Sequence, residues 1–243
     1  MSDIRKQARR AGLLYLLGIL PGPFCLLYVP GVLIAPGDAT ATANHVRASQ
    51  TLLRLGLGGE MFSAIMVIFA VMALYRLLKD VNEKHAALMV ILWLISVPIS
   101  CLNVLGGSAA LVLASGPAYL SAFPPDQIDA MVLLSLRLHN TGFAVAQIFW
   151  GLWLIPYGLL VMRSGFIPRV LGTLQIIAGC AYVVTSATAF LLPQYLHLVS
   201  RVMMALEAGE APMVLWLVIF GAKAAPPAAV PPASPAPATA VMR

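Results

Sequence analysis

Long runs of apolar residues, separated by short clusters of charged and small residues, make up most of this chain. A helix needs about 20 mostly apolar residues to cross about 30 Å of membrane hydrocarbon. Six stretches approach or exceed this length, at about 11–34, 55–75, 86–114, 142–162, 170–192 and 202–222. The pattern therefore predicts an all-α, polytopic membrane protein, a six-transmembrane-helix bundle made of three helical hairpins.

Long connections join the two helices of each hairpin, and parts of them are amphipathic. Residues 125–140 begin with Pro124-Pro125-Asp126, a typical helix start, and then place apolar side chains on one side. Joined to the fourth span, this helix would have about 37 residues and a length of ~55 Å, more than one bilayer. We therefore expect a bend near residues 140–142, with the first half lying at the membrane surface. The segment 43–54 is expected to lie there in the same way.

Composition agrees with this fold class and excludes several kinds of protein. Hydrophobic residues make up 60% of the 243 residues and charged residues only 10%, whereas a soluble domain has about 25% charged residues. This excludes a soluble enzyme and a nucleic-acid-binding domain, despite the net charge of +6. Residues 1–222 therefore form the transmembrane domain, in contact with membrane lipids, and the Pro/Ala-rich residues 223–243 are predicted to be a disordered tail.

The distribution of basic residues predicts the orientation of the chain. Of the 15 basic residues, most fall on one side of the predicted bundle: Arg5, Lys6, Arg9, Arg10, Arg76, Lys79, Lys84, Arg163, Arg169, Lys223 and Arg243. The remaining four, Arg47, Arg54, Arg137 and Arg201, fall in the longer connections on the other side. Because cytoplasmic loops are enriched in Lys and Arg, both termini and the tail are expected to be cytoplasmic.

Three glutamates lie within the apolar stretches and are the most informative polar residues. An ionised side chain at the centre of a spanning helix costs roughly 2.5–3.5 kcal/mol, so such groups face the bundle interior, pair with a cation or are protonated. Our hypothesis is an outward-facing polar pocket. Its predicted ligand-binding residues are Glu60, His139, Asn140, Gln147, Glu207 and Glu210. The alternative is a structural network of charges and hydrogen bonds that locks the hairpins together.

Three of these residues share one spacing along their helices. Glu60, Gln147 and Glu207 each precede a basic residue by 16 positions, which corresponds to about 24 Å of helix. In a hydrocarbon core about 30 Å thick, this places all three in the outer third. Both a triplicated hairpin and a coincidence among polar residues near helix ends explain the spacing.

Motifs for other kinds of chemistry are missing from the sequence. The histidines His45, His139 and His197 and the three glutamates are suitable ligand types for a transition metal, but none has the close spacing of a helical metal site and there is no HExxH. The three cysteines form no CxxC motif, and neither a P-loop nor GxSxG occurs. We therefore expect no metal and no cofactor, and enzyme activity is not favoured.

Several short motifs resemble one known family. These are Gly151–Gly158 (GLWLIPYG), Arg163–Gly172 (RSGFIPRVLG), Arg10–Tyr15 (RAGLLY) and His139–Phe143 (HNTGF). They are similar to the bacterial membrane family known as domain of unknown function 4386 (DUF4386), and the resemblance covers the chain up to the tail. It implies a multi-pass protein of the bacterial cytoplasmic (inner) membrane with six helices. It implies no catalytic residues.

The leading interpretation is a membrane protein that binds or moves a small amphipathic or lipidic molecule through the polar pocket. One alternative is an intramembrane enzyme that uses Glu and His side chains of the pocket as acid and base. Another is a structural or regulatory subunit of a membrane complex. The sequence fixes neither the ligand nor the oligomeric state.

Overall fold

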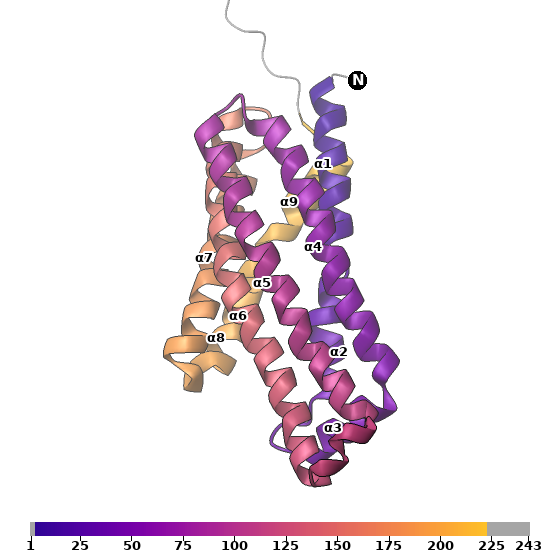
Figure 1. Cartoon of the computed structure of the whole chain (residues 1–243). Coiled ribbons are helices and arrows are strands. Elements are labelled where there is room, and N and C mark those ends of the chain that lie inside the picture. The colour runs from indigo at the N-terminus through magenta and orange to yellow at the C-terminus, as the bar shows by residue number, and fades with distance from the viewer. Residues whose placement is uncertain (1–2, 223–243) are drawn as a thin grey trace, which may run out of the picture.

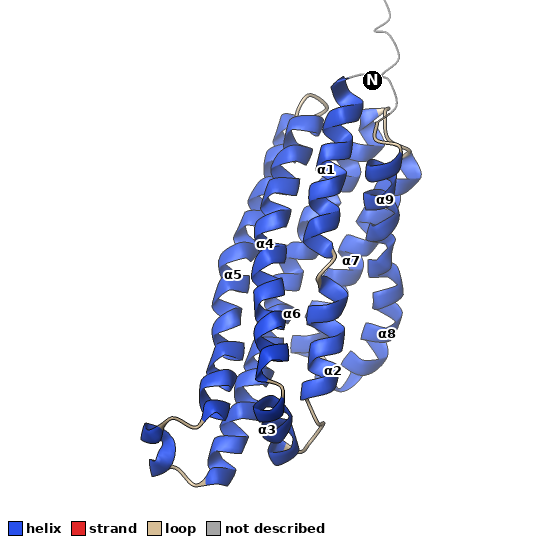
Figure 2. Ribbon diagram, turned by 90° about the vertical axis from the view of Figure 1, so that its right-hand side faces the viewer, coloured by secondary structure: helices blue, strands red, loops and turns tan. Residues whose placement is uncertain are grey.

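The computed structural model describes residues 3–222, and within them it consists of helices joined by short loops, with no strands (Figures 1 and 2). Six helical segments are long and apolar enough to cross a membrane, which confirms the predicted all-α polytopic bundle. The expected disordered tail lies outside the described residues. The segments are Asp3–Leu33, Gln50–Leu78, Glu83–Ser115, Pro125–Ser164, Arg169–Leu191 and Pro193–Ile219.

Three of the spans are single α-helices that end close to the predicted boundaries or extend beyond them. They are α4 (Gln50–Leu78), α5 (Glu83–Ser115) and α7 (Arg169–Leu191). The second span begins several residues earlier than predicted, because the polar residues at its start continue the helix. Each hairpin packs against itself, and the loops after α4 and before α7 lie at the same end of the bundle as the N-terminus (Figure 1).

The first and last spans are interrupted. The first contains α1 (Asp3–Ile19), a π-helical segment η1 (Pro23–Tyr28) and α2 (Val29–Leu33), because Pro21 and Pro23 lack the N–H that would continue the α-helix. The last contains η3 (Pro193–Tyr195), α8 (Leu196–Glu207), a 3₁₀ turn η4 (Ala208–Glu210) and α9 (Ala211–Ile219).

The two interrupted spans are neighbours in the half of the bundle that carries the N-terminus. There α9 packs beside α1, and the Arg9 guanidinium donates a 2.7 Å hydrogen bond to the carbonyl oxygen of Ile219 at the end of α9. A basic group at this position satisfies a carbonyl that the helix itself leaves free. In the other half, α8 packs against α7.

The expected bend in the fourth span is wrong. Residues 125–140 and the fourth span form one continuous helix, α6 (Pro125–Ser164), of 40 residues. Its first half does not lie alone on a surface, since Val132 and Leu136 are buried against neighbouring helices. At about 1.5 Å per residue α6 is ~60 Å long, and together with α5 it extends beyond the end of α7 (Figure 1).

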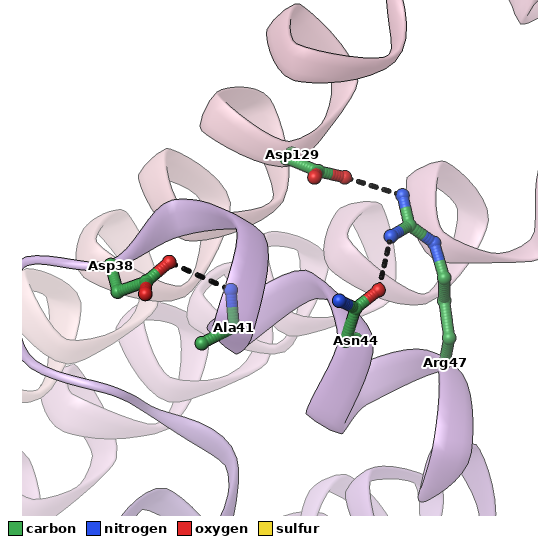
Figure 3. Close-up of polar contacts among 5 residues, drawn as sticks. All are labelled: Asp38, Ala41, Asn44, Arg47 and Asp129. Atoms are coloured by element: carbon green, nitrogen blue, oxygen red, sulfur yellow. Dashed lines mark hydrogen bonds and ion pairs between the residues drawn. The ribbon is translucent and has the colours of Figure 1, made fainter.

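A short helix, α3 (Ala39–Ala48), covers this extended end of the bundle (Figures 2 and 3). The Asp38 carboxylate accepts a 2.8 Å hydrogen bond from the backbone N–H of Ala41 and caps the helix. Arg47 then joins α3 to α6 through a 2.5 Å ion pair with Asp129, whose side chain is 8% exposed. The amphipathic segment predicted before the second span is therefore a helix packed on α5 and α6.

The core has its centre at Trp153 on α6. Its ring contacts those of Tyr15, Trp93 and Tyr157, with centroid distances of 5.7, 5.5 and 5.5 Å. The helices α6 and α7 approach so closely that a Cβ added to Gly158 would lie 2.5 Å from the carbonyl oxygen of Gly172. Gly151, Gly158 and Gly172 of the GLWLIPYG and RSGFIPRVLG motifs are therefore packing residues, while Gly165 ends α6 with a positive φ of 72°.

Candidate functional site

Glu60 on α4 and His139 on α6 are joined by a hydrogen bond toward the extended end of the bundle. The distance from His139 Nε2 to Glu60 Oε1 is 3.2 Å, and the two side chains are 8% and 11% exposed. The other ring nitrogen, Nδ1, lies 3.0 Å from the backbone carbonyl oxygen of Asn103 on α5. This contact fits between the helices because Gly106 leaves room beside the backbone of His139.

These two contacts determine how many protons the pair holds. A carbonyl oxygen only accepts, so Nδ1 of His139 must carry a hydrogen and donate it to Asn103. A hydrogen bond between Nε2 and the Glu60 carboxyl then requires one further proton, held by either atom. The pair is therefore neutral in total, as imidazolium with carboxylate or as imidazole with carboxylic acid.

A cavity of about 60 Å³ adjoins Glu60 at the interruption of the first span. It lies between η1, α4, α5 and α6. Its walls are mostly apolar and aromatic, with three serine hydroxyls: Pro21, Gly22, Cys25, Leu26, Gly59, Glu60, Ser63, Ala64, Trp93, Ser96, Val97, Ser100, Phe143 and Trp150. A smaller cavity of about 20 Å³ adjoins the same carboxylate from the other side and is lined by His139 and Asn140.

Hydrogen-bonding capacity in the larger cavity is only partly used. Glu60 makes its hydrogen bond to His139 through Oε1, and Oε2 has no hydrogen-bond partner within residues 3–222. Ser63 donates to the carbonyl oxygen of Gly18, where α1 ends, and Ser96 donates to that of Trp93. The indole N–H of Trp93 is buried without a partner in the described part of the chain. Such a group is uncommon in a closed core and is expected beside a ligand or water.

The position of the pair along the bundle follows from a contact between α6 and α7. Ser186 donates a 2.5 Å hydrogen bond to the carbonyl oxygen of Ala144. Because these helices are antiparallel, Leu191 at the end of α7 is level with His139. The pair therefore lies level with the end of the shortest spanning helix, α7.

A second polar group surrounds Glu210 at the interruption of the last span. Its carboxylate accepts hydrogen bonds from Tyr15 on α1 and from Tyr182 on α7, the latter at 3.3 Å. The amide of Gln175 lies 3.5 Å from the carbonyl oxygens of Gly209 and Glu210. Tyr182 and Gln175 are 9 and 16 residues from the end of α7, which places this group about 14–24 Å along the helix from the level of the Glu60 pair.

Glu207 lies on the edge of this second group. It accepts a 2.8 Å hydrogen bond from Thr185, and no Lys or Arg within the described residues lies within 4 Å of either Glu207 or Glu210. Arg54 and Arg201 bond to other residues of their own helices, Arg54 to Gln50 and Arg201 to His197. Both acids are held by neutral hydroxyl groups.

The structure thus distributes the six predicted pocket residues over two groups. Glu60, His139 and Asn140 lie together at the cavities, while Glu207 and Glu210 lie in the second group. Gln147 is half-buried and lines neither cavity. Because the last span packs against α7, Glu207 contacts Thr185 and Glu210 contacts Tyr182 on that helix.

Sequence reasoning missed several residues that build the two groups. Trp93 and Trp150 both line the larger cavity, and neither was among the predicted site residues. The Pro21-Gly22-Pro23 sequence was a usable signal, because two prolines so close together interrupt a helix and leave space beside it. No signal in the sequence points to Tyr15 or Asn103, whose roles depend on how the helices pair.

Metal binding finds no geometric support in the described part of the chain. Within residues 3–222, no three His, Cys, Asp or Glu side chains come close enough together to hold a metal ion. His45 and His197 are exposed. His197 contacts Arg201, and neither of these histidines joins His139.

Comparison with known proteins identifies a family for this chain. Searches of curated proteins and of solved structures gave no match. A family model described as a domain of unknown function (DUF4386) matches residues 10–221, which include every helix that builds the two polar groups. The chain is therefore a polytopic helical membrane protein that belongs to the DUF4386 family.

Proposed function

We propose that this protein binds a small amphipathic molecule in the cavity beside Glu60. The observation that carries the proposal is the free carboxylate oxygen, Oε2, of a glutamate whose other oxygen is held by His139. A buried acid that only locks helices together would have both oxygens in contact with protein donors, as Glu210 has with two tyrosines. Spare capacity next to empty space is a property of binding sites.

The size and place of the cavity favour an amphipathic ligand. A volume of about 60 Å³ holds a polar group of a few atoms, since one water needs about 10–15 Å³ by this measure. Leu26, one of the lining residues, is 39% exposed on the surface of the bundle, where it would contact lipid. A ligand would place its polar group at Glu60 and extend its apolar part past Leu26 into the membrane.

The proposal includes an orientation. The end of the bundle that carries the N-terminus also carries the loops with Lys79, Lys84 and Arg163, so we place it in the cytoplasm. The cavity then opens in the outer half of a bacterial cytoplasmic membrane. A reporter that is active on only one side of the membrane, fused after Arg243, tests this orientation, and periplasmic activity would reverse it.

Native mass spectrometry of the purified protein in a gentle detergent tests ligand binding. We expect a retained mass on the wild type that Glu60→Gln abolishes, because the amide replaces the accepting carboxylate. Glu207→Gln serves as the matched control and should retain the mass, since Glu207 lies outside the cavity. Loss of the mass in both variants would favour the single six-residue pocket, and no retained mass would refute ligand binding.

One observation favours a second candidate, acid–base catalysis in the membrane. His139 is oriented by the Asn103 carbonyl and shares a proton with Glu60, an arrangement able to deliver or accept a proton at the cavity. The same mass spectra distinguish the candidates. A catalyst would convert an added substrate into a product of different mass, while a binding protein would release it unchanged.

A further inference from the structure

The charges that line the two cavities beside Glu60 limit the ligands that fit there. Of the described residues in their walls, the titratable ones are Cys25, Glu60 and His139. Arg54 on α4 and Arg137 on α6 are exposed and line neither cavity. An anionic ligand would therefore meet a carboxylate with no Lys or Arg to pair with it. A cationic ligand would meet an acceptor.

The walls also suit an organic cation in their chemical composition. Trp93, Phe143 and Trp150 contribute three aromatic rings to one small cavity. The faces of such rings attract ammonium groups, with an effect of about 0.5–2 kcal/mol. Ser96 already donates its hydrogen to a backbone carbonyl, so its oxygen is left as an acceptor. An ammonium group carries three donors and no acceptor, which matches the carboxylate and hydroxyl oxygens, while the indole N–H of Trp93 then needs an acceptor such as water.

We infer that the ligand carries a primary ammonium group and that this group replaces the proton shared by Glu60 and His139. The inference deepens the proposed function and depends on it. Before binding, the pair holds one exchangeable proton. When the ammonium group bonds to the Glu60 carboxylate, that proton leaves to water, and His139 keeps the hydrogen that it donates to Asn103. One positive charge enters and one departs, so the buried site remains neutral in total.

This exchange avoids the main cost of binding a cation within a membrane. If the proton stayed, the site would carry an imidazolium, an ammonium and only one carboxylate. A net buried charge of this kind is costly in an apolar environment. Because no other charged group of the described residues lines the cavities, nothing else compensates for it. Proton release is thus the expected accompaniment of amine binding.

Isothermal titration calorimetry on the full chain in phosphatidylcholine nanodiscs tests the inference. The probes are hexylamine, hexanol and hexanoate, with empty nanodiscs as the blank for membrane partitioning. A hydrogen bond to a charged group is worth about 1.5–3 kcal/mol, so hexylamine should bind about ten- to a hundredfold more tightly than hexanol. Hexanoate should bind most weakly. Titrations in two buffers of different ionisation enthalpy should show about one proton released for each amine bound.

Glu60→Gln should reduce the affinity for hexylamine to that for hexanol, because the amide carries no negative charge. Glu83→Gln removes an exposed acid at the opposite end of the bundle and should leave every affinity unchanged. As long as the pair holds its proton, the wild-type affinity for hexylamine should also fall about tenfold for each unit by which the pH is lowered, as one competing proton requires.

Each contrary outcome has a separate meaning. Binding of hexanol or hexanoate that needs Glu60 and equals or exceeds that of hexylamine would refute the ammonium assignment and leave the proposed function standing. Amine binding without proton release would refute the exchange. If no probe binds and native mass spectrometry shows no retained mass, both the inference and the proposed function are wrong.

Discussion

The two intramembrane acids Glu60 and Glu210 have similar sequence settings and different environments. Each follows a glycine, and each lies at an interruption of a spanning helix, Glu60 beside the break in the first span and Glu210 within the break in the last. The carboxylate of Glu210 is enclosed by tyrosine hydroxyls. That of Glu60 has one oxygen held by His139 and the other free beside a cavity.

This difference teaches that an acid at membrane depth does not by itself identify a ligand site. The cost of burying a carboxyl group can be offset by neutral donors, as it is at Glu210, and the result is a link between α1, α7 and the last span. What distinguishes Glu60 is unused hydrogen-bonding capacity together with space. Substitutions in the closed group should therefore change stability, and substitutions at the cavity should change binding.

The largest loss of stability is expected for Gly158→Ala. A methyl group there would lie 2.5 Å from the carbonyl oxygen of Gly172 and force α6 and α7 apart, displacing the helices that carry Tyr157 and Tyr182. Overpacking of this kind typically costs about 1–3 kcal/mol, and the upper end is expected for contact with rigid backbone. The SDS concentration at the unfolding midpoint measures the effect. Gly58→Ala, whose added Cβ has no neighbour within 4 Å, is the control.

Glu210→Ala should have the next largest effect on stability. It leaves the hydroxyl groups of Tyr15 and Tyr182 without their acceptor, which costs about 1–3 kcal/mol for a buried donor, but it also removes a carboxyl group that is costly to bury, so the net loss should stay below that of Gly158→Ala. A lower apparent Tm in detergent is expected, with any retained ligand mass unchanged. Glu207→Ala removes one hydrogen bond where Glu210→Ala removes two, and should lower the Tm less. A larger effect at Glu207 would contradict the distinction between the enclosed acid and its neighbour.

Ser100→Leu should separate binding from stability. Ser100 is half-buried on the wall of the larger cavity and makes no side-chain hydrogen bond within the described residues, so a leucine there occupies the space for the ligand. The free energy of unfolding should change by less than about 1 kcal/mol, since filling a cavity offsets the strain. Native mass spectrometry should show loss of the retained mass. An unchanged mass would place the ligand outside this cavity.

The sequence predicted the features that the membrane itself imposes on the chain, and it failed for features that depend on contacts between helices. Hydrophobic periodicity and length predicted the six spans, because the need for about 20 apolar residues is set by the membrane and not by helix contacts. The same reasoning was wrong about the bend in α6. It assumed that a helix leaves the bundle where the membrane ends, whereas α3 and α5 cover the first half of α6 through Val132, Leu136 and the Arg47–Asp129 pair.

For the site, the cost of buried charge drew attention to all three acids, and the predicted pocket included both Glu60 and His139, which lie in contact. The sequence did not show that the acids form two separate groups. Contacts between side chains on different helices depend on how each helix is rotated about its axis, and hydrophobic periodicity does not determine this rotation. Tyr15 is an example, since a tyrosine within an apolar stretch gives no sign that its hydroxyl group meets Glu210. Trp93 was not predicted as a site residue for the same reason.

The smallest effects on stability are expected for alanine substitutions of Gly59 and Gly209, the glycines that precede Glu60 and Glu210. In Gly209→Ala the added Cβ makes only ordinary contacts, the nearest at 3.5 Å. The free energy of unfolding should therefore rise, by no more than about 1 kcal/mol. In Gly59→Ala the Cβ would lie 2.6 Å from Sγ of Cys25, whose side chain can rotate into the cavity. Binding at Glu60 should therefore weaken while the Tm changes little. Equal retained masses in the two variants would show that the space beside Cys25 is not used by the ligand.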